Sequence, residues 1–311
     1  MALSALLNNY IARTKNTGAD APVFFAVLRR RRSPWYNTIN DSGRIPAAIS
    51  RMAGNIISIS AQRKGGGHLE HWDRLRGDQG FYWDDGLFRP STDTFLLGGF
   101  PVLRRGERVC DLGAGTGLLG ALLLTREPSL TVTGLELRED ACRLARRTAE
   151  RSGWRERLLC RQGDLRRRED LPPAGGFDLV VSNPPYFPPE TGRVSPQETR
   201  SVARSEVVCT LEDVCRAAGW LLRWGGRFCV VFPTERLAEL METARRFGLE
   251  PKRLRMVQHD AAGVPGLVLL ECRRGGKPGL RAEPALLLYD PDGRETAEHR
   301  RAYFREEEQA L

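Results

Sequence analysis

The chain has 311 residues and 41% of them are hydrophobic, so it can bury a sizeable core as one large domain or two ordinary ones. Its net charge of +9 suits a polyanionic partner, and nearly all of the basic residues are arginine, which binds phosphate bidentately. Codon bias in a GC-rich genome would give the same excess, so charge alone assigns no partner. Because no apolar run approaches the roughly 20 residues of a membrane-spanning helix, we expect no membrane or export step.

The seven cysteines show neither a CxxC pair nor a cluster with histidine. Most of them lie within apolar runs, as in "RFCVV" around Cys229. This pattern is typical of small buried hydrophobic residues in a reducing cytoplasm, so we expect a cytoplasmic protein without a metal site or disulfide framework.

Residues 1–67 differ in composition from the rest and end in "KGGG". They are predicted to form a flexible leader. The arginine run at 29–32 fits an RNA-binding arm, but a solvated tail or a start codon placed too far upstream explains it equally. The remaining chain is divided into a domain at 68–305 and a short tail at 306–311.

From about residue 100, short apolar runs alternate with amphipathic stretches. This alternation predicts an α/β fold with a doubly wound, mostly parallel, seven-stranded Rossmann-like sheet and helices on both faces. The expected strands are 108–112, 130–137, 158–160, 177–182, 226–232, 254–258 and 267–272. The expected helices are 118–126, 138–152, 211–223 and 234–247.

The stretch "VCDLGAGTGLLG" places Gly113, Gly115 and Gly117 between the first of these strands and its helix. A turn without side chains lets a ligand approach the backbone, at the edge of the sheet where such folds bind ligands. Dinucleotide-binding domains use a similar turn. However, Asp111 would repel a pyrophosphate, whereas it can accept a hydrogen bond from an ammonium group or hold a zwitterion through water.

Two further acids follow the next two strands. Glu136 in "LELRED" stands about 20 residues after the glycine turn, where a carboxylate can accept hydrogen bonds from both hydroxyls of a ribose. Asp164 follows in "GDL". Together with Asp111, these acids outline a pocket for a ribose-bearing, partly cationic ligand.

The series "DLGAGTG", "LELRED", "GDL" and "SNPPYF" resembles the Rossmann-like methyltransferases that depend on S-adenosylmethionine. The resemblance implies a methyltransferase domain with this cofactor. It places Asp111 and the turn beside the methionyl part, Glu136 at the ribose, and Asp164 with Leu165 at the adenine. The implied turn residues are Gly113, Ala114, Gly115 and Gly117.

The "SNPPYF" stretch ends the strand at 177–182. Pro184 and Pro185 cannot donate backbone hydrogen bonds, so the exit is held extended with its carbonyls directed outward. The Asn183 oxygen and the Pro184 carbonyl can each accept one N–H of an exocyclic amine, and Tyr186 can stack on the ring. This motif is expected to carry methyl transfer to a planar nitrogen, and no strong base is needed because the proton leaves from the cationic product.

Three flanking stretches narrow the resemblance: "FYWDDGLFRPSTDTFLLGGF", "ETRSVARSEV" and "RRGGKPGLRAEPALLLYDPDG". Over about residues 69–305, the chain resembles the tRNA1(Val) adenine-37 N6-methyltransferase family. The resemblance implies that Pro90, Asp93 and the helix at 94–100 cover the cofactor pocket. Arg193, Arg200 and Arg204 are candidates for RNA contact, although each also fits a solvated surface residue or an ion-pair partner.

The expected enzyme is therefore an S-adenosylmethionine-dependent N-methyltransferase that modifies adenine N6 in a tRNA anticodon loop and acts as a monomer. The same NPPY chemistry would serve a protein-glutamine N5-methyltransferase or an rRNA guanine-N2 methyltransferase. A non-catalytic RNA-binding protein would not need the intact acid series. A DNA methyltransferase would need a separate target-recognition domain, for which we see no segment of sufficient length.

Overall fold

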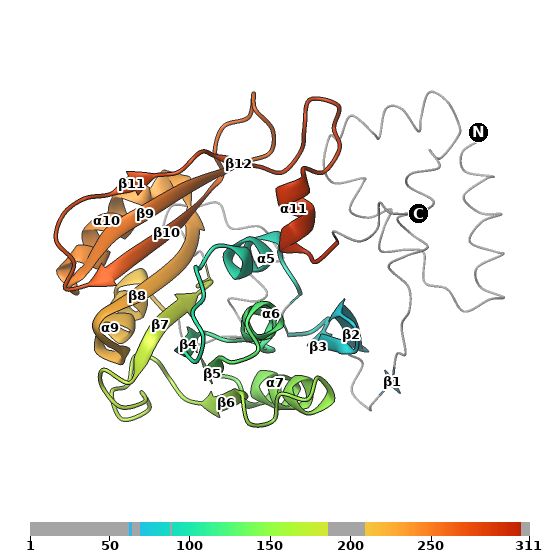
Figure 1. Ribbon diagram of the computed structural model, residues 1–311. Helices are drawn as coiled ribbons and strands as arrows, with labels where there is room; N and C mark the ends of the chain where they lie inside the picture. The colour runs from blue at the N-terminus through green and yellow to red at the C-terminus, as the bar shows by residue number, and fades with distance from the viewer. Residues whose placement is uncertain (1–61, 64–68, 88, 186–208, 306–311) are drawn as a thin grey trace, which may run out of the picture. The chain divides into compact units, whose positions relative to one another are not determined.

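The computed structural model describes residues 62–63, 69–87, 89–185 and 209–305. Within these ranges, the main sheet has the strand order β11-β9-β10-β8-β7-β4-β5-β6, with β12 also paired to β9 (Figure 1). The strands are β4 (Arg108–Leu112), β5 (Thr131–Glu136), β6 (Leu158–Gln162), β7 (Phe177–Ser182), β8 (Leu222–Pro233), β9 (Leu249–Gln258), β10 (Leu267–Arg274), β11 (Arg281–Ala282) and β12 (Leu286–Leu287).

Strand β10 is antiparallel to β8 and β9, and all other pairs in this sheet are parallel. The chain runs outward from β4 to β5 and β6 and then returns to β7 on the other side of β4. The carboxyl ends of these parallel strands lie at one edge, and the order of the strands reverses between β4 and β7. Open α/β sheets bind ligands at such a reversal.

The central strands bury side chains on both faces because helices cover the sheet from both sides. In β4, Val109 belongs to one hydrophobic cluster and Cys110 to the other; in β7, Val181 and Val180 alternate in the same way. Both faces are therefore dry, which explains the continuous apolar runs. The first cluster contains residues of α5 (Thr92–Gly99) and α6 (Leu118–Arg126) and the second residues of α9 (Leu211–Leu221) and α10 (Leu237–Arg246); the other helices are α7 (Glu139–Arg151) and α11 (Ala297–Ala302).

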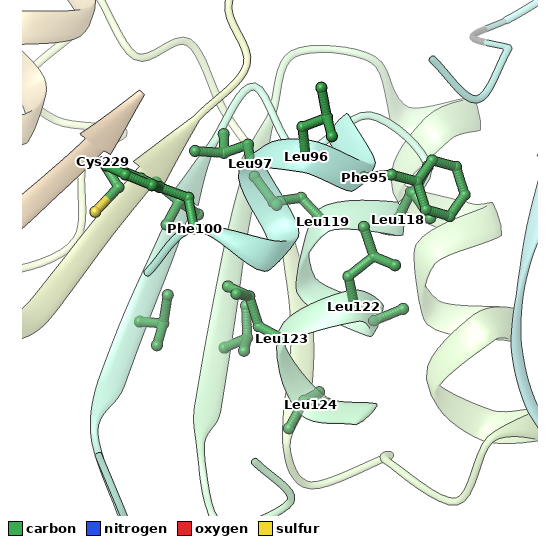
Figure 2. Packing of buried hydrophobic residues seen from close by; sticks show 14 of the residues in the cluster. Phe95, Leu96, Leu97, Phe100, Leu118, Leu119, Leu122, Leu123, Leu124 and Cys229 are labelled. Carbon is green, nitrogen blue, oxygen red and sulfur yellow. The ribbon is translucent and has the colours of Figure 1, made fainter. Parts of the chain in front are cut away.

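Helix α5 packs directly on α6, as Figure 2 shows for their leucine side chains. Leu96, Leu97 and Leu122 are fully buried in this contact. The helices approach closely at Gly98, where a Cβ would lie only 2.8 Å from the Leu122 side chain. This packing fixes α5 above the first helix after the glycine turn.

A second, antiparallel sheet precedes the main one and consists of β1 (Gln62–Arg63), β2 (Leu69–Arg76) and β3 (Gln79–Asp84). It is fastened to the end of α7. The Tyr82 amide donates to Thr148 Oγ1 (2.8 Å), and the Gly80 amide donates to Ser152 Oγ (3.1 Å). No strands were predicted in this part of the sequence.

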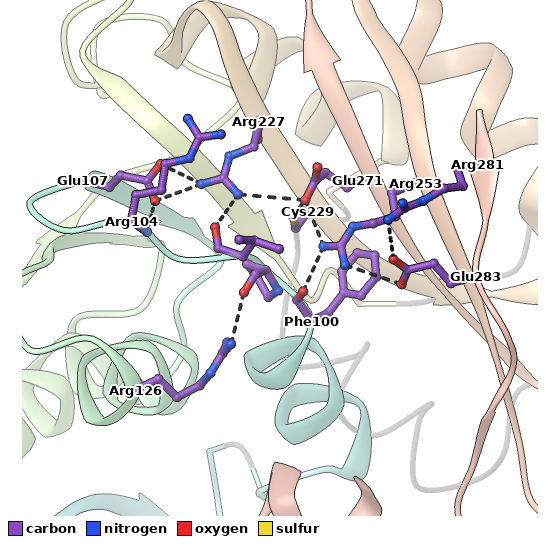
Figure 3. Close-up of polar contacts among 12 residues, drawn as sticks. Phe100, Arg104, Glu107, Arg126, Arg227, Cys229, Arg253, Glu271, Arg281 and Glu283 are labelled. Carbon is purple, nitrogen blue, oxygen red and sulfur yellow. Dashed lines mark hydrogen bonds and ion pairs between the residues drawn. The ribbon is translucent and has the colours of Figure 1, made fainter. Parts of the chain in front are cut away.

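A network of ion pairs and arginine–carbonyl hydrogen bonds holds the loop between α5 and β4 (Figure 3). Arg227 of β8 donates to both oxygens of Glu107 (2.6 and 2.8 Å), and each residue is less than 10% exposed. Arg227 also donates to the Val102 carbonyl, and Arg253 of β9 donates to the Phe100 carbonyl. The loop that follows α5 is thereby tied to the sheet.

The predicted fold class is confirmed, and the segments 108–112, 118–126 and 177–182 have the expected bounds. The sheet exceeds the expected seven strands by the short β11 and β12. Strand β8 begins at Leu222 rather than at 226, because its irregular start contains Gly225 at φ 76° and interrupts the apolar run. The expected helix at 234–247 opens with a 3₁₀ turn, η1 (Thr234–Arg236).

All seven cysteines are free, and five are buried: Cys110, Cys142, Cys215, Cys229 and Cys272. Within the described ranges, no helix is long and apolar enough to cross a membrane. In the same ranges, no three side chains of the metal-ligating types cluster together. Most of the predicted leader, residues 1–61 and 64–67, lies outside the described residues, as does the tail at 306–311.

Candidate functional site

The glycine turn joins β4 to α6 at the carboxyl edge of the sheet. The amides of Gly113 and Ala114 donate to the Leu135 carbonyl at the end of β5, at 2.9 and 3.2 Å. Gly115 has φ 53°, and Gly117, the N-cap of α6, has φ 83° with Ala145 only 2.9 Å from the position of a Cβ. Side chains would be strained at both positions and would clash at Gly117, so the turn depends on glycine.

Asp111 lies at the end of β4 and is only 2% exposed. Within the described residues, its Oδ2 atom is buried without a hydrogen-bond partner. Burial, followed by the nearby charge of Glu136, raises the pKa of Asp111 to about 7. A buried carboxylate oxygen that lacks a donor is costly, so the site fits a ligand that brings a cationic or N–H group to this position.

Glu136 ends β5 and faces the glycine turn. The Gly115 amide donates to its Oε2 (2.8 Å), and the Arg138 amide donates to its Oε1 (2.9 Å). These two bonds fix the direction of the carboxylate. A carboxylate accepts about four hydrogen bonds, so Glu136 keeps the capacity to hold two ribose hydroxyls.

Asp164 follows β6. The amide of Gly163, the residue before it, donates to the Glu136 carbonyl (2.9 Å). The Asp164 carboxylate is paired with Arg166, whose Nε lies 2.9 Å from Oδ1 and whose Nη2 lies 2.5 Å from Oδ2. The hydrogen bonds from Arg166 lower the pKa of Asp164. Leu165 is partly buried against the second hydrophobic cluster. A contact between Asp164 and an adenine would therefore form beside an existing ion pair.

The NPPY segment leaves β7 next to the glycine turn. Ser182 is fully buried, and its hydroxyl donates to the Leu112 carbonyl (2.8 Å) at the end of β4. Asn183 is half-buried, and its Nδ2 donates to Thr94 Oγ1 of α5 (2.8 Å). Pro184 is buried and Pro185 is exposed, whereas Tyr186 lies outside the described residues.

These contacts join the predicted site residues of the three strand ends and the NPPY exit at one edge of the sheet. Pro90 stands just before α5 and Asp93 in its first turn, so this part of the expected cover is next to Thr94 and hence to Asn183. The RNA-contact candidates Arg193, Arg200 and Arg204 lie outside the described residues.

Thr94 and Ser182 had no role in the site predicted from the sequence. Each is a short polar residue that is almost fully buried in an apolar neighbourhood, at 4% and 0% exposure. A hydroxyl inside "TDTFLLGG" and another directly before Asn183 were the available signals. Their partners are distant in the sequence, so the contacts appear only in the folded chain.

A cavity of about 540 Å³ lies at the other end of α5 and is separate from the glycine turn. Its lining includes Leu96, Gly98 and Phe100 and four arginines: Arg76, Arg126, Arg255 and Arg301. Of the predicted site, only the covering helix at 94–100 contributes to this lining, and none of the predicted catalytic or cofactor-binding residues does. The candidate site is therefore the carboxyl edge of the sheet.

The chain is similar to known methyltransferases. The family described as "Methyltransferase small domain" matches residues 90–244. A tRNA1(Val) (adenine(37)-N6)-methyltransferase of Tolumonas auensis is 31% identical over 234 residues, which cover 75% of this chain and 94% of that protein. The chain belongs to the family of the tRNA1(Val) (adenine(37)-N6)-methyltransferases. The protein of the same name from Dickeya chrysanthemi is 34% identical over 210 residues, which cover 66% of this chain and 81% of that protein.

The protein is thus an S-adenosylmethionine-dependent methyltransferase, as the motifs predicted. Among solved structures, a predicted O-methyltransferase, Atu636 of Agrobacterium tumefaciens, superposes with a TM-score of 0.57 at 20% identity. The superposition covers 69% of this chain and 96% of that one and supports the fold assignment alone.

Proposed function

We propose that this methyltransferase modifies the N6 amine of an adenine in a tRNA anticodon loop. The curated relatives are named for this reaction on tRNA1(Val). The observation that carries the proposal is the position of Asn183, at the end of β7 and beside the glycine turn, with its amide nitrogen bonded to Thr94. This arrangement suits a substrate that presents N–H donors.

The proposed cofactor contacts follow the contiguous strand ends. The Asp111 carboxylate accepts from the ammonium group of the methionyl part, directly or through water, and Glu136 accepts from the ribose hydroxyls. Asp164 and Leu165 border the adenine, and Pro90 and Asp93 belong to the cover. The turn backbone contributes Gly113, Ala114, Gly115 and Gly117.

When it is bound, S-adenosylmethionine supplies an electrophilic methyl group on its sulfonium. The Asn183 oxygen and the Pro184 carbonyl accept the two N–H groups of the target amine and hold its nitrogen in line for transfer. Pro184 and Pro185 keep this segment extended, and Tyr186 stacks on the base. The chain need not supply a strong base, because the amine loses its proton after it has become cationic.

We further propose that the enzyme acts in the cytoplasm, where tRNA is modified, as a monomer without a metal ion. Sedimentation of the protein with and without tRNA measures the assembly state. Activity that persists after treatment with a chelator supports metal-free transfer, and activity restored only by a divalent cation contradicts it.

The deciding experiment incubates the purified protein with labelled S-adenosylmethionine and total tRNA from a strain that lacks the gene, followed by nucleoside mass spectrometry. We expect labelled N6-methyladenosine that maps to one anticodon loop. Label in ribosomal guanine N2 or in protein glutamine instead would retain the NPPY chemistry and overturn the substrate. The control is the variant Asn183→Ala, which should leave all three substrates unlabelled.

A further inference from the structure

The Thr94 hydroxyl lies against the amide nitrogen of Asn183. Thr94 is 4% exposed, and its Oγ1 accepts from Asn183 Nδ2 at 2.8 Å. Ser91 Oγ lies 3.2 Å from the same oxygen, in position to accept a hydrogen bond from the Thr94 hydroxyl. A hydroxyl that donates to Ser91 presents a lone pair to Asn183 and therefore selects the nitrogen side of the amide.

The two ends of a carboxamide have opposite hydrogen-bonding characters. Because Nδ2 is directed at Thr94, the amide oxygen points away from Thr94. A rotation by about 180° would exchange the two ends and direct N–H donors to where the oxygen now lies. The first orientation suits an amine, which donates, and the second suits a carbonyl oxygen, which accepts.

We propose that Thr94, supported by Ser91, is a positioning residue that fixes the Asn183 amide as an acceptor and thereby makes the site select an exocyclic amine over a carbonyl oxygen. This inference rests on the proposed function and adds the origin of its specificity. Thr94 is not a catalytic residue, since it acts through Asn183.

Helix α5 is rigid enough for this role. Its apolar face packs on α6, and the loop after it is tied to β8 and β9 through Arg227 and Arg253. At its start, the Tyr303 hydroxyl donates to Thr92 Oγ1 (3.0 Å). The hydroxyl of Thr94 is therefore held in place independently of Asn183.

The test compares Thr94→Val, which keeps the shape but loses the acceptor, with Thr94→Ser, which keeps the hydroxyl. Thr92→Val is the control for a loosened helix start, because it removes the bond from Tyr303 while the packing of α5 on α6 and the contact of Thr94 with Asn183 remain. The ligands are two anticodon stem-loop RNAs with adenosine or inosine at the methylated position. Inosine carries a carbonyl oxygen in place of the amine, and binding is measured with S-adenosylhomocysteine present.

We expect the wild type to bind the adenosine RNA about 5- to 20-fold more tightly than the inosine RNA, because one mispaired buried polar group separates them. Thr94→Val should reduce this ratio to near one and lower kcat about 10- to 100-fold, with cofactor affinity within about twofold of the wild type. Thr94→Ser and Thr92→Val should keep the wild-type ratio.

A wild-type ratio in Thr94→Val, with undiminished kcat, would overturn the inference. Equal binding of both RNAs by a wild type that labels adenine N6 would also overturn the inference, whereas equal binding without label in tRNA would overturn the adenine function. In that case, the kcat of Thr94→Val on whichever amine substrate becomes labelled still tests Thr94. If Thr94→Val does not melt cooperatively, Ser91→Ala replaces it. We then expect a smaller fall in the adenosine-to-inosine binding ratio, because only the hydrogen-bond acceptor for the Thr94 hydroxyl is removed.

Discussion

The Ser182 hydroxyl donates to the Leu112 carbonyl across 2.8 Å, and this bond joins the last residue of β7 to the last residue of β4. Leu112 is followed directly by the glycine turn and Ser182 by Asn183. The bond therefore ties the glycine turn to the NPPY exit, and its full burial protects it from competition by water.

Ser182→Ala should lower the free energy of unfolding by about 1–2 kcal/mol, because it leaves a buried carbonyl without this donor. The kcat should fall by more than the small loss of folded protein explains, because the glycine turn and the NPPY exit are no longer joined by this bond. Denaturant titration and single-turnover transfer measure the two effects. A variant with wild-type kcat would show that the bond is only structural.

Asn183→Ala should abolish methyl transfer and leave cofactor binding nearly intact, because in the proposed site Asn183 meets the amine and the cofactor contacts belong to the turn and the strand ends. Isothermal titration with S-adenosylmethionine and a labelled-transfer assay measure the two properties. Transfer at the wild-type rate would disprove the proposal that Asn183 holds the target amine.

Asp111, in its proposed role, should make both stability and cofactor binding depend on pH. Its folded pKa of about 7 lies above its usual 3.8, so between these values the folded protein keeps a proton that the unfolded chain has lost. The stability of the ligand-free protein should therefore fall as pH rises through this window. At pH 8, Asp111→Asn should be more stable than the wild type by a few kcal/mol, at about 1.4 kcal/mol per pKa unit.

Cofactor affinity should show the opposite trend. An ammonium group favours the ionised carboxylate, so the wild type should bind S-adenosylmethionine more tightly as pH rises through about 7. Asp111→Asn should bind weakly at every pH. Asp178→Asn, near the start of β7, is the control. Burial alone would raise the pKa of Asp178, but the hydrogen bonds from Arg108 and Arg223 outweigh burial and lower it. A flat wild-type binding profile between pH 5.5 and about 8.5 would contradict this role of Asp111.

The buried pair of Arg227 and Glu107 should be costly to break. Arg227→Ala removes one charge and leaves Glu107 buried, which should lower the free energy of unfolding by about 3–5 kcal/mol. Arg281→Ala, which removes an exposed partner of Glu283, should cost under about 1 kcal/mol (Figure 3). Chemical denaturation distinguishes the two, and similar losses would show that the burial of the first pair has no energetic effect.

The predicted domain boundary is tested with a chain that begins at Gly67. Strands β2 and β3 remain in it, and the main sheet is complete. We expect a cooperative melting transition and unchanged affinity for S-adenosylmethionine. Loss of the transition would show that the preceding residues, which include β1, are structural.

The sequence by itself determined the alternation of strands and helices, the glycine turn, the three acids and the NPPY exit. These signals are local: a buried strand is a short apolar run, and a turn needs glycine where φ is positive. The hairpin of β2 and β3 was missed because its aromatic and charged residues do not form a simple alternation. The start of β8 was misplaced because glycines interrupt its apolar run.

Only the tertiary structure decided which groups meet across long distances in the chain. Thr94 contacts Asn183 across 89 residues, and Ser182 contacts Leu112 across 70. No periodicity encodes such pairs, because each depends on how α5 and two strands pack around one core. The same packing removes Asp111 from water and raises its pKa, whereas sequence alone shows only a carboxylate before a glycine turn. Residue types thus specify which functional groups are available. Packing sets how these groups are oriented, and burial sets whether they are charged.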